Sequence, residues 1–417
     1  MSTSDHPNAD VRMRGFVEKV SVEAVRGWLH GELEKLDSVS GEEVSLQESA
    51  KRVLAVDVVS EVNVPEFERA MMDGYAVRAI DIKSASLRSP VLLEVVGESF
   101  PGQAFQGIVT AGKTVRAMTG SKLPPGTDAV LPVEQTCTGG GEQVLAQQSI
   151  TPGRNVGSVG EDIRAGEVVL RAGRVLRPQD VGVLSSIGMK HVSVVRRPRV
   201  RIVVTGDELL PAGSKPQAAR IVDANGPMLA ALVERDGGEP VFPGIVPDDP
   251  EAILAALKDD ADVILVSGGT SVGQEDHVPT LLAEHGELAI HGVAMRPASP
   301  VGMGLLDGRL VFLLPGNPVA CLCGYDFFAG VAIRSRGCRA TDWPYRTVQI
   351  TLSAEIKSPT GRLDYIRMLL EQGQAKPVPK SGASVLSSTT RADGFVVIPA
   401  DSEGYQAGTE VELFLYD

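Results

Sequence analysis

Four polar turns in the middle of the chain carry residue types that can bind or transform a charged ligand. Each turn follows a short apolar run that predicts a buried strand. In an open α/β sheet the carboxyl ends of parallel strands share the edge where ligands bind, so we expect the four turns to meet there. They are Thr205-Gly206-Asp207-Glu208 after Val204, Val246-Pro247-Asp248-Asp249 after Ile245, Ser267 to Asp276 after Val266, and Pro315-Gly316-Asn317-Pro318 after Leu314.

Carboxylates and glycines in these turns suit a phosphate ligand that is held partly through a metal ion. A Gly-Gly turn brings backbone N–H groups close to a ligand, and helix N-termini favour anions. Glu208, Asp248 and Asp276 can hold a divalent cation, usually Mg²⁺ with retained waters, or one of them can act as a general base. The alternative for each single carboxylate is a helix cap or turn residue, and it is strongest for Asp207 and Asp249.

Positive charge is concentrated in two places. Arg296 follows the apolar run 290–295 and either binds a phosphate or oxyanion or forms a structural ion pair. The run Arg196 to Arg201 predicts a solvated edge.

The segment from Gly107 to Thr114 matches the P-loop pattern, but no helix fits after Thr114, so we treat it as a chance match.

The elements that must position these residues alternate between strand and helix over 199–335, which predicts a mostly parallel sheet covered by helices. The regions 62–152 and beyond 343 show short alternating runs broken by glycine and proline, the pattern of compact β domains. Helices are predicted over 21–36, 47–56, 178–188, 227–235, 250–258, 278–284 and from about 317, and strands over 91–96, 200–204, 240–245, 262–266, 309–314 and 410–416.

The composition excludes several other classes of protein. The 417 residues carry 53 acidic and 40 basic side chains, and a net charge of −13 argues against nucleic-acid binding and requires a locally basic pocket for any anion. No apolar stretch approaches the about 20 residues of a spanning helix, and the polar start is unlike a signal peptide, so we expect a cytoplasmic protein without a membrane partner. Four cysteines without a Cys-x-x-Cys pair predict reduced, buried thiols rather than disulfides or zinc ligands.

A set of motifs in a fixed order resembles the molybdopterin molybdotransferase family, which includes MoeA and the E domain of gephyrin. Together the motifs span the chain from about residue 20 to its end. The matching stretches are Met72 to Arg78, Met118 to Val130, Gly160 to Gly166, Thr205 to Leu209, Ser267 to Asp276 and Leu314 to Val319.

The resemblance implies a homodimer whose chains have four domains. A flexible tail over 1–18 precedes a discontinuous linker domain, helical and extended, over 19–57 and 155–195. An inserted β domain is expected over 58–154, an α/β domain similar to molybdopterin adenylyltransferases over 196–338, and a C-terminal β barrel over 339–417.

The resemblance also implies a reaction, in which molybdate enters adenylylated molybdopterin with Mg²⁺ and AMP leaves. The dithiolene sulfurs of the pterin, rather than cysteines, would be the soft ligands of the metal. By motif matching, Glu208, Asp248 and Asp276 bind Mg²⁺ or activate water, and Asp73 and Thr119 close the cleft from the β domain of the partner subunit. Molybdopterin adenylyltransferase and molybdoenzymes are the expected partner proteins. The turns that would bind the pterin nucleotide contribute Ser267, Gly268, Gly269, Ser271, Pro315, Gly316, Asn317 and Pro318.

The oxyanion site of the family is altered in this chain. Where the family has a Lys-x-x-x-Lys-Pro-Gly-Lys-Pro pattern, the chain has one cation, Arg296, and Ala383 stands where a serine is usual. The oxyanion ligands expected from the resemblance are Arg296, Ser299, Arg367 and Ser384. Fewer positive charges predict weaker molybdate binding. Two alternatives follow, a paralogue that binds the pterin nucleotide as a carrier or assembly subunit without transferring metal, and a molybdopterin adenylyltransferase.

Overall fold

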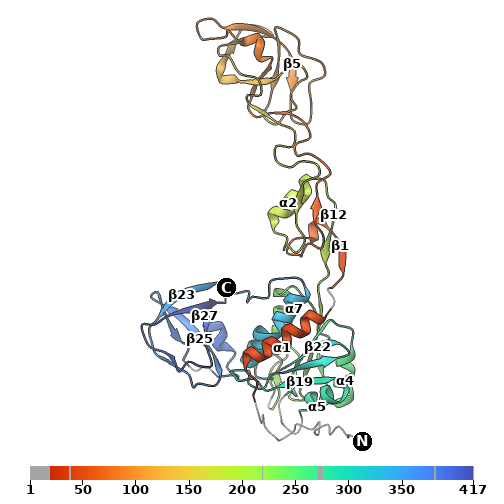
Figure 1. Ribbon diagram of the computed structural model, residues 1–417, viewed down its shortest axis with the longest axis vertical. Helices are drawn as coiled ribbons and strands as arrows, with labels where there is room; N and C mark the ends of the chain where they lie inside the picture. Colours follow the sequence, from red (N-terminus) through yellow and green to blue (C-terminus); the bar gives the residue numbers. More distant parts are fainter. Residues whose placement is uncertain (1–18, 37–38, 218, 271–275, 380–381, 417) are drawn as a thin grey trace. The chain divides into compact units, whose positions relative to one another are not determined.

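The computed structural model describes residues 19–36, 39–217, 219–270, 276–379 and 382–416. The chain forms two compact units, one combining Met1–Glu42 with Val195–Asp417 and the other spanning Glu43–Val194. We call them unit 1 and unit 2, and Figure 1 labels their main elements. Among the described residues, every helix is too short or too polar to cross a membrane.

A seven-stranded sheet lies at the centre of unit 1, in the order β16-β13-β18-β22-β21-β19 with β17 also paired to β13. The pairings of β13 with β16, β17 and β18, and of β18 with β22, are parallel, whereas β21 is antiparallel to both neighbours. The predicted mostly parallel sheet is therefore confirmed. The strands are β13 (Arg199–Thr205), β16 (Glu239–Val241), β17 (Ile245–Val246), β18 (Val263–Ser267), β19 (Glu287–His291), β21 (Gly302–Leu306) and β22 (Arg309–Leu314).

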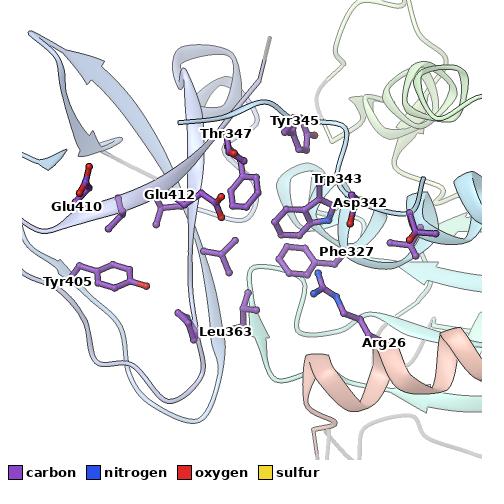
Figure 2. A pocket seen from close by; sticks show the side chains of 17 residues that line it. Arg26, Phe327, Asp342, Trp343, Tyr345, Thr347, Leu363, Tyr405, Glu410 and Glu412 are labelled. Atoms are coloured by element: carbon purple, nitrogen blue, oxygen red, sulfur yellow. The ribbon is translucent and has the colours of Figure 1, made fainter. Parts of the chain in front are cut away.

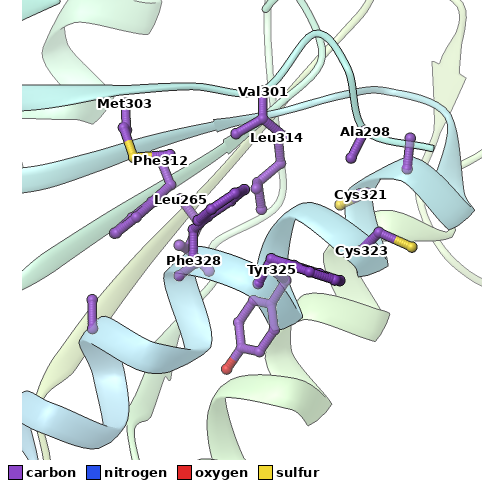
Figure 3. Close-up of a cluster of buried hydrophobic side chains, with 14 of the residues drawn as sticks. Leu265, Ala298, Val301, Met303, Phe312, Leu314, Cys321, Cys323, Tyr325 and Phe328 are labelled. Atoms are coloured by element: carbon purple, nitrogen blue, oxygen red, sulfur yellow. The ribbon is translucent and has the colours of Figure 1, made fainter. Parts of the chain in front are cut away.

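Helices cover both faces of this sheet, because alternate residues of a buried strand point to opposite faces. Ile202 packs in one core with α1, α3 and the continuous run α6-η4-α7, and Val203 packs in another with α4 and α5. Figure 3 shows Leu265 and Phe312 of the sheet beside Phe328 of η4. The helices are α1 (Val22–Lys35), α3 (Asn225–Arg235), α4 (Pro250–Lys258), α5 (Val278–His285), α6 (Pro318–Gly324), the π-helical η4 (Tyr325–Ala329) and α7 (Gly330–Arg336).

The four cysteines are free thiols, as predicted, but only two of them are buried. Cys321 and Cys323 lie inside the helix-covered core, and Figure 3 shows their sulfur atoms pointing to different sides of α6. Cys338 is exposed and Cys137 is intermediate, so the prediction of burial is wrong for these two.

The C-terminal part of unit 1 is a closed barrel, which confirms the predicted fold of this region. Five strands follow each other in the order β25-β26-β23-β29-β27, and β27 also pairs with β25 to close the ring. The strand β20 adds to β25 in parallel, so the barrel joins the loop that leaves β19. Its elements are β20 (Met295–Arg296), β23 (Thr347–Leu352), β25 (Leu363–Glu371), β26 (Gln374–Pro377), α8 (Ser387–Arg391), β27 (Gly394–Ile398) and β29 (Glu410–Leu415), with the pairs β24 (Ile356–Lys357) and β28 (Gly404–Tyr405), and β14 (Leu209–Leu210) and β15 (Ile221–Val222), beside the sheets.

Unit 2 contains a six-stranded sheet in the order β7-β4-β6-β5-β9-β8 and three two-stranded pairs. The pairs are β1 with β12, β2 with β11 and β3 with β10, so segments from the two ends of unit 2 lie side by side. The elements are β1 (Gly41–Ser45), η1 (Leu46–Glu48), β2 (Val58–Val59), β3 (Arg69–Ala70), β4 (Gly74–Val77), η2 (Ala79–Ile82), β5 (Val91–Ser99), β6 (Lys113–Ala117), β7 (Ala129–Pro132), η3 (Val133–Gln135), β8 (Thr136–Thr138), β9 (Gln143–Ala146), β10 (Val156–Gly157), β11 (Val168–Leu170), α2 (Pro178–Ser186) and β12 (His191–Val195).

Two predicted elements differ from the structure. The helix predicted over 47–56 is wrong, since Lys51 has a φ of +66° and Val53 and Leu54 form bridges with distant segments. Contacts far along the chain therefore override the local helical pattern. The strand predicted over 240–245 is divided into β16 and β17, both paired with β13, and Pro243 lies in the gap, where it has no N–H to donate to a ladder.

The prediction for the arginine run 196–201 is only partly correct, whereas the prediction for the P-loop match is confirmed. The arginine run is not a simple solvated edge, because Arg196 forms an ion pair with Asp262 at 2.9 Å and Arg201, which is 5% exposed, pairs with Asp259. The dismissal of the P-loop match is confirmed, since Lys113 begins the strand β6 and no helix follows it.

Candidate functional site

The ends of three neighbouring strands position the candidate site in unit 1. Val204 of β13 is paired with Ser267 of β18, and Ser267 is paired with Leu314 of β22. Because the three strands are parallel and in register, the turns that follow them start side by side. The fourth turn starts beside them as well, since Val246 of β17 pairs in parallel with Thr205 of β13, so the predicted convergence of the four turns is confirmed.

These turns line a cavity of about 550 Å³, which we call the acidic cavity. Its lining includes the carboxylates Glu208, Asp223 and Asp276 and contains no lysine or arginine among the described residues. The predicted nucleotide-binding residues found in its wall are Ser267, Gly268, Gly269, Pro315, Gly316, Asn317 and Pro318. Ser271, the remaining predicted member, lies outside the described residues.

Glycine is required at the start of the turn that follows β18. Gly268 has a φ of +97°, and a Cβ atom there would lie 2.0 Å from the carbonyl oxygen of Thr205. Gly269 also has a positive φ, of +60°. The backbone of this turn therefore lies directly against the end of β13, which exposes peptide groups rather than side chains to the cavity.

A second cavity, of about 520 Å³, adjoins the first and is lined by cations. We call it the basic cavity. Lys19, Arg296 and Arg362 line it, and no aspartate or glutamate does so among the described residues. Pro300, Pro315 and Asn317 line both cavities, so the two share a wall.

The predicted oxyanion ligands are placed in different ways. Arg296 and Ser299 line the basic cavity, and the Ser299 hydroxyl donates to the Val293 carbonyl oxygen at 3.2 Å. Ser384 lines the acidic cavity instead. Arg367 is only 3% exposed, lines neither cavity, and donates to the Gly382 carbonyl oxygen at 3.4 Å, so it holds the turn that carries Ser384.

Asp248 lies behind the acidic cavity rather than in its lining. The Thr205 hydroxyl donates to Asp248 Oδ1 at 3.1 Å. Burial raises the pKa of the Asp248 carboxyl, and the hydrogen bond from Thr205 opposes that shift. The neighbouring Asp249 accepts from the Ala252 N–H at 2.9 Å, which confirms it as the N-cap of α4.

Glu208 and Asp276 remain as the predicted metal-binding carboxylates that line the acidic cavity. Among the described residues, no three His, Cys, Asp or Glu side chains gather closely enough to hold a metal ion by themselves. Mg²⁺ is usually held by one or two carboxylates together with waters and substrate phosphates, so two carboxylates in the wall fit an ion that arrives with a nucleotide.

Asn225, which no sequence pattern singled out, ties two of the turns together. Its Nδ2 donates to Ser267 Oγ and to the Gly316 carbonyl oxygen, both at 2.8 Å, and its side chain is almost fully buried. Asp223 accepts from the N–H groups of Asn225 and Gly226 and so caps the start of α3. Asp223 lies four residues before the predicted start of this helix at Pro227, and reading it as a capping signal could have revealed this corner.

Asp73 and Thr119 are brought together in unit 2. The backbone N–H and the hydroxyl of Thr119 donate to Asp73 Oδ1 at 2.7 and 2.8 Å. The backbone hydrogen bond, followed by the hydroxyl bond, lowers the pKa of Asp73, so this carboxylate is ionised at neutral pH.

A third cavity, of about 880 Å³, lies elsewhere in unit 1, where α1 and η4 face the barrel, and the sequence did not predict it. Figure 2 shows Arg26 of α1 pointing at Phe327 and Trp343, with the guanidinium 5.4 and 5.5 Å from the two ring centres. Burial lowers the pKa of Arg26. Glu410 and Glu412 of β29 line the opposite wall.

Comparison with known protein families covers nearly the whole chain. Residues 20–188 match the MoeA N-terminal region (domain I and II), 201–334 match the probable molybdopterin binding domain, and 349–416 match the MoeA C-terminal region (domain IV). These three matches occur in the order of the motifs found in the sequence.

Whole-length relatives agree with the family matches. The chain is 32% identical to a molybdopterin molybdenumtransferase of Haemophilus influenzae over 381 residues, covering 89% of this chain and 93% of the relative. A Staphylococcus aureus enzyme of the same name is 31% identical over 382 residues, with 89% and 90% covered. Among solved structures, a molybdopterin biosynthesis MoeA protein of Pyrococcus horikoshii has a TM-score of 0.81 at 32% identity, covering 96% of this chain and 100% of that one.

The fold and the relatives together define a multidomain transferase of molybdenum cofactor biosynthesis. The chain belongs to the MoeA family.

Proposed function

We propose that the protein inserts molybdate into adenylylated molybdopterin, with Mg²⁺, and that AMP leaves. The observation that carries the proposal is the pair of adjoining cavities with opposite charge. A cavity lined by three carboxylates repels a bare nucleotide but accepts one whose phosphates carry a divalent cation, whereas a cavity lined by cations suits an oxyanion. The shared wall keeps the two substrates adjacent.

In this proposal Glu208 and Asp276 hold Mg²⁺ against the pyrophosphate. When bound, the ion would neutralise phosphate charge and polarise the phosphorus–oxygen bonds. The backbone groups of the Gly268-Gly269 turn and the N-terminus of α6 hold the nucleotide, and Asn225 keeps their turns in place. Asp248, with its raised pKa, is the candidate for transient proton transfer near the cavity.

In this proposal the sulfur ligands of molybdenum come from the pterin rather than from the protein. Cys321 and Cys323 are fully buried, and burial raises the pKa of the Cys321 thiol to about 12. A protonated, enclosed thiol is a poor ligand, so these cysteines do not compete with the dithiolene sulfurs for molybdenum.

We extend the proposal to a homodimer in the cytoplasm, in which Asp73 and Thr119 act on the site of the partner subunit. An adenylyltransferase would supply the substrate and molybdoenzymes would receive the product. Mixing Asp73→Asn and Asp276→Asn subunits tests the shared site. Each variant alone should be inactive, and random 1:1 mixing should restore about a quarter of wild-type activity, because half of the dimers then carry one intact site. No recovery on mixing would contradict sharing between subunits.

The central experiment measures AMP release from adenylylated molybdopterin by the pure protein with Mg²⁺, with and without molybdate. Release that depends on molybdate, and that Asp276→Asn abolishes, is the expected result. Release that is indifferent to molybdate, or binding without release, would favour a carrier of the pterin nucleotide. Formation of adenylylated molybdopterin from ATP would favour an adenylyltransferase instead.

A further inference from the structure

The basic cavity contains a cation that comes from a distant part of the chain. Lys19 and Arg296 both line the cavity, although they are 277 positions apart in the sequence. Within the described part of the chain, neither side chain makes an ion pair. Arg362, the third cation, is different, because its Nε donates to Asp364 Oδ1 at 2.9 Å and that carboxylate is buried. Lys19 and Arg296 therefore supply the uncompensated positive charge of the cavity.

Backbone pairing fixes the position of Lys19. The next residue, Val20, forms a parallel bridge with Val293. The Val20 N–H donates to the Gly292 carbonyl oxygen at 3.1 Å, and the Ala294 N–H donates to the Val20 carbonyl oxygen at 2.8 Å. The segment before α1 is thus anchored to the loop that leads to Arg296, and Ser21 begins the helix immediately afterwards by accepting from the Ala24 N–H.

We propose that Lys19 is an oxyanion-binding residue, which holds molybdate in the basic cavity together with Arg296. The inference rests on the proposed function, because it names a further residue of that same site. Lys19 replaces in space, rather than in sequence, one of the cations missing from the loop around Arg296.

Charge makes the contribution of Lys19 significant. Molybdate is a dianion at neutral pH, and the chain carries a net charge of −13, so the overall field opposes its approach. Two cations that line the same cavity counter that field locally. Lys19 is exposed and screened by salt, so its removal should weaken binding by about fivefold rather than abolish it.

The test is equilibrium binding of sodium molybdate to the full chain by calorimetry at low and at physiological ionic strength. The variants are Lys19→Gln, which removes the charge, and Lys19→Arg, which keeps it. Lys35→Gln is the matched control, since Lys35 is an exposed lysine of the adjacent helix that pairs with Glu32. Far-UV circular dichroism checks that each variant folds.

We expect about fivefold weaker binding for Lys19→Gln and a smaller loss at higher salt, with Lys19→Arg and Lys35→Gln near wild type. Equal binding by Lys19→Gln and wild type would overturn the role of Lys19 and leave the proposed function intact. Equal weakening by Lys35→Gln would also overturn it, because the effect would then reflect net charge alone. Failure of the wild-type chain to bind molybdate would instead contradict the oxyanion half of the proposed function.

Discussion

Replacing Asp326 of η4 with asparagine should destabilise unit 1. Asp326 and Asp236 are two buried carboxylates that pair with Arg235 and Arg334, and the substitution removes one of the two negative charges. Asp326 and Asp236 have no exposed side-chain surface. Arg235 donates to Asp326 at 2.9 Å and to Asp236 at 3.0 Å, and Arg334 forms an ion pair with Asp236 at 3.0 Å. The Tyr345 hydroxyl donates to Asp326 Oδ2 at 2.8 Å, which ties the segment that enters the barrel to the helix that begins at the acidic cavity. An asparagine offers one acceptor oxygen where Asp326 uses two.

The expected cost follows from burial. Removing one partner of a buried ion pair typically costs 3 to 5 kcal/mol, whereas an exposed pair contributes about 0 to 1 kcal/mol. Burial raises the pKa of Asp326, so desolvation already offsets part of the attraction, and we expect a loss of about 3 kcal/mol. The matched control is Asp307→Asn, which breaks the pair with Arg309 where the aspartate is 65% exposed, and which should cost less than about 1 kcal/mol.

Urea unfolding followed by tryptophan fluorescence measures this loss of stability specifically in unit 1. The chain has two tryptophans, Trp28 and Trp343, and both belong to unit 1. The Trp343 indole N–H donates to the Asp326 carbonyl oxygen at 3.0 Å, so the probe lies beside the network. We expect the Asp326→Asn midpoint to fall by about 1 M. A shift no larger than that of Asp307→Asn would refute the argument that burial makes this network stabilising.

Three further predictions concern the site and unit 2. Asn225→Ala removes the donor to both turns, and kcat/KM for AMP release should fall at least about tenfold; an unchanged value would remove Asn225 from the site. Gly268→Ala places a Cβ atom against Thr205 at a positive φ and should cost about 2 kcal/mol in thermal unfolding, whereas Gly182→Ala, with open space around a helical glycine, should stabilise slightly. Hydrogen bonds from Arg177 and Arg174 hold the pKa of Asp180 well below its usual range. The free energy of unfolding of Asp180→Asn, followed by circular dichroism, should therefore be about 2 kcal/mol lower than that of the wild type at pH 5–7. That difference should shrink below about pH 4, as protonation removes the same interaction from the wild type.

Local signals predicted the elements whose ends are set by nearby residues. The helix 21–36 is confirmed as α1, and the Ser21 hydroxyl accepts from the Ala24 N–H. The helix beginning at Pro178 is confirmed as α2, since proline suits the first turn. Such signals are reliable because a cap or a first-turn proline acts within a few residues. The predicted helix over 47–56 failed for the opposite reason, because Val53 and Leu54 form bridges with Val175 and Val194, more than 100 positions away.

No local sequence signal predicted the π-helical segment η4. The apolar run after Asn317 predicts a helix but not its pitch. Gly324 and Gly330 flank the segment, and a Cβ atom at either would meet Val301 or Asp236 at less than 3 Å. Close packing therefore requires glycine at both ends of the π-helical segment, and the residues that impose it lie far from the segment in the sequence.

Local sequence signals identified the turns that line the acidic cavity. Polar and glycine-rich segments after apolar runs identify the ends of parallel strands, and three of these turns do meet at the acidic cavity. Which charged groups reach a cavity depends instead on packing between segments far apart in the chain. Packing brought Lys19 and Arg296 into the lining of one cavity, buried Arg367 against the Gly382 turn, and placed Asp248 outside the lining of the acidic cavity. The physical reason is that spacing along the chain specifies the backbone path within one element, whereas the charge of a cavity is summed over segments brought together by packing.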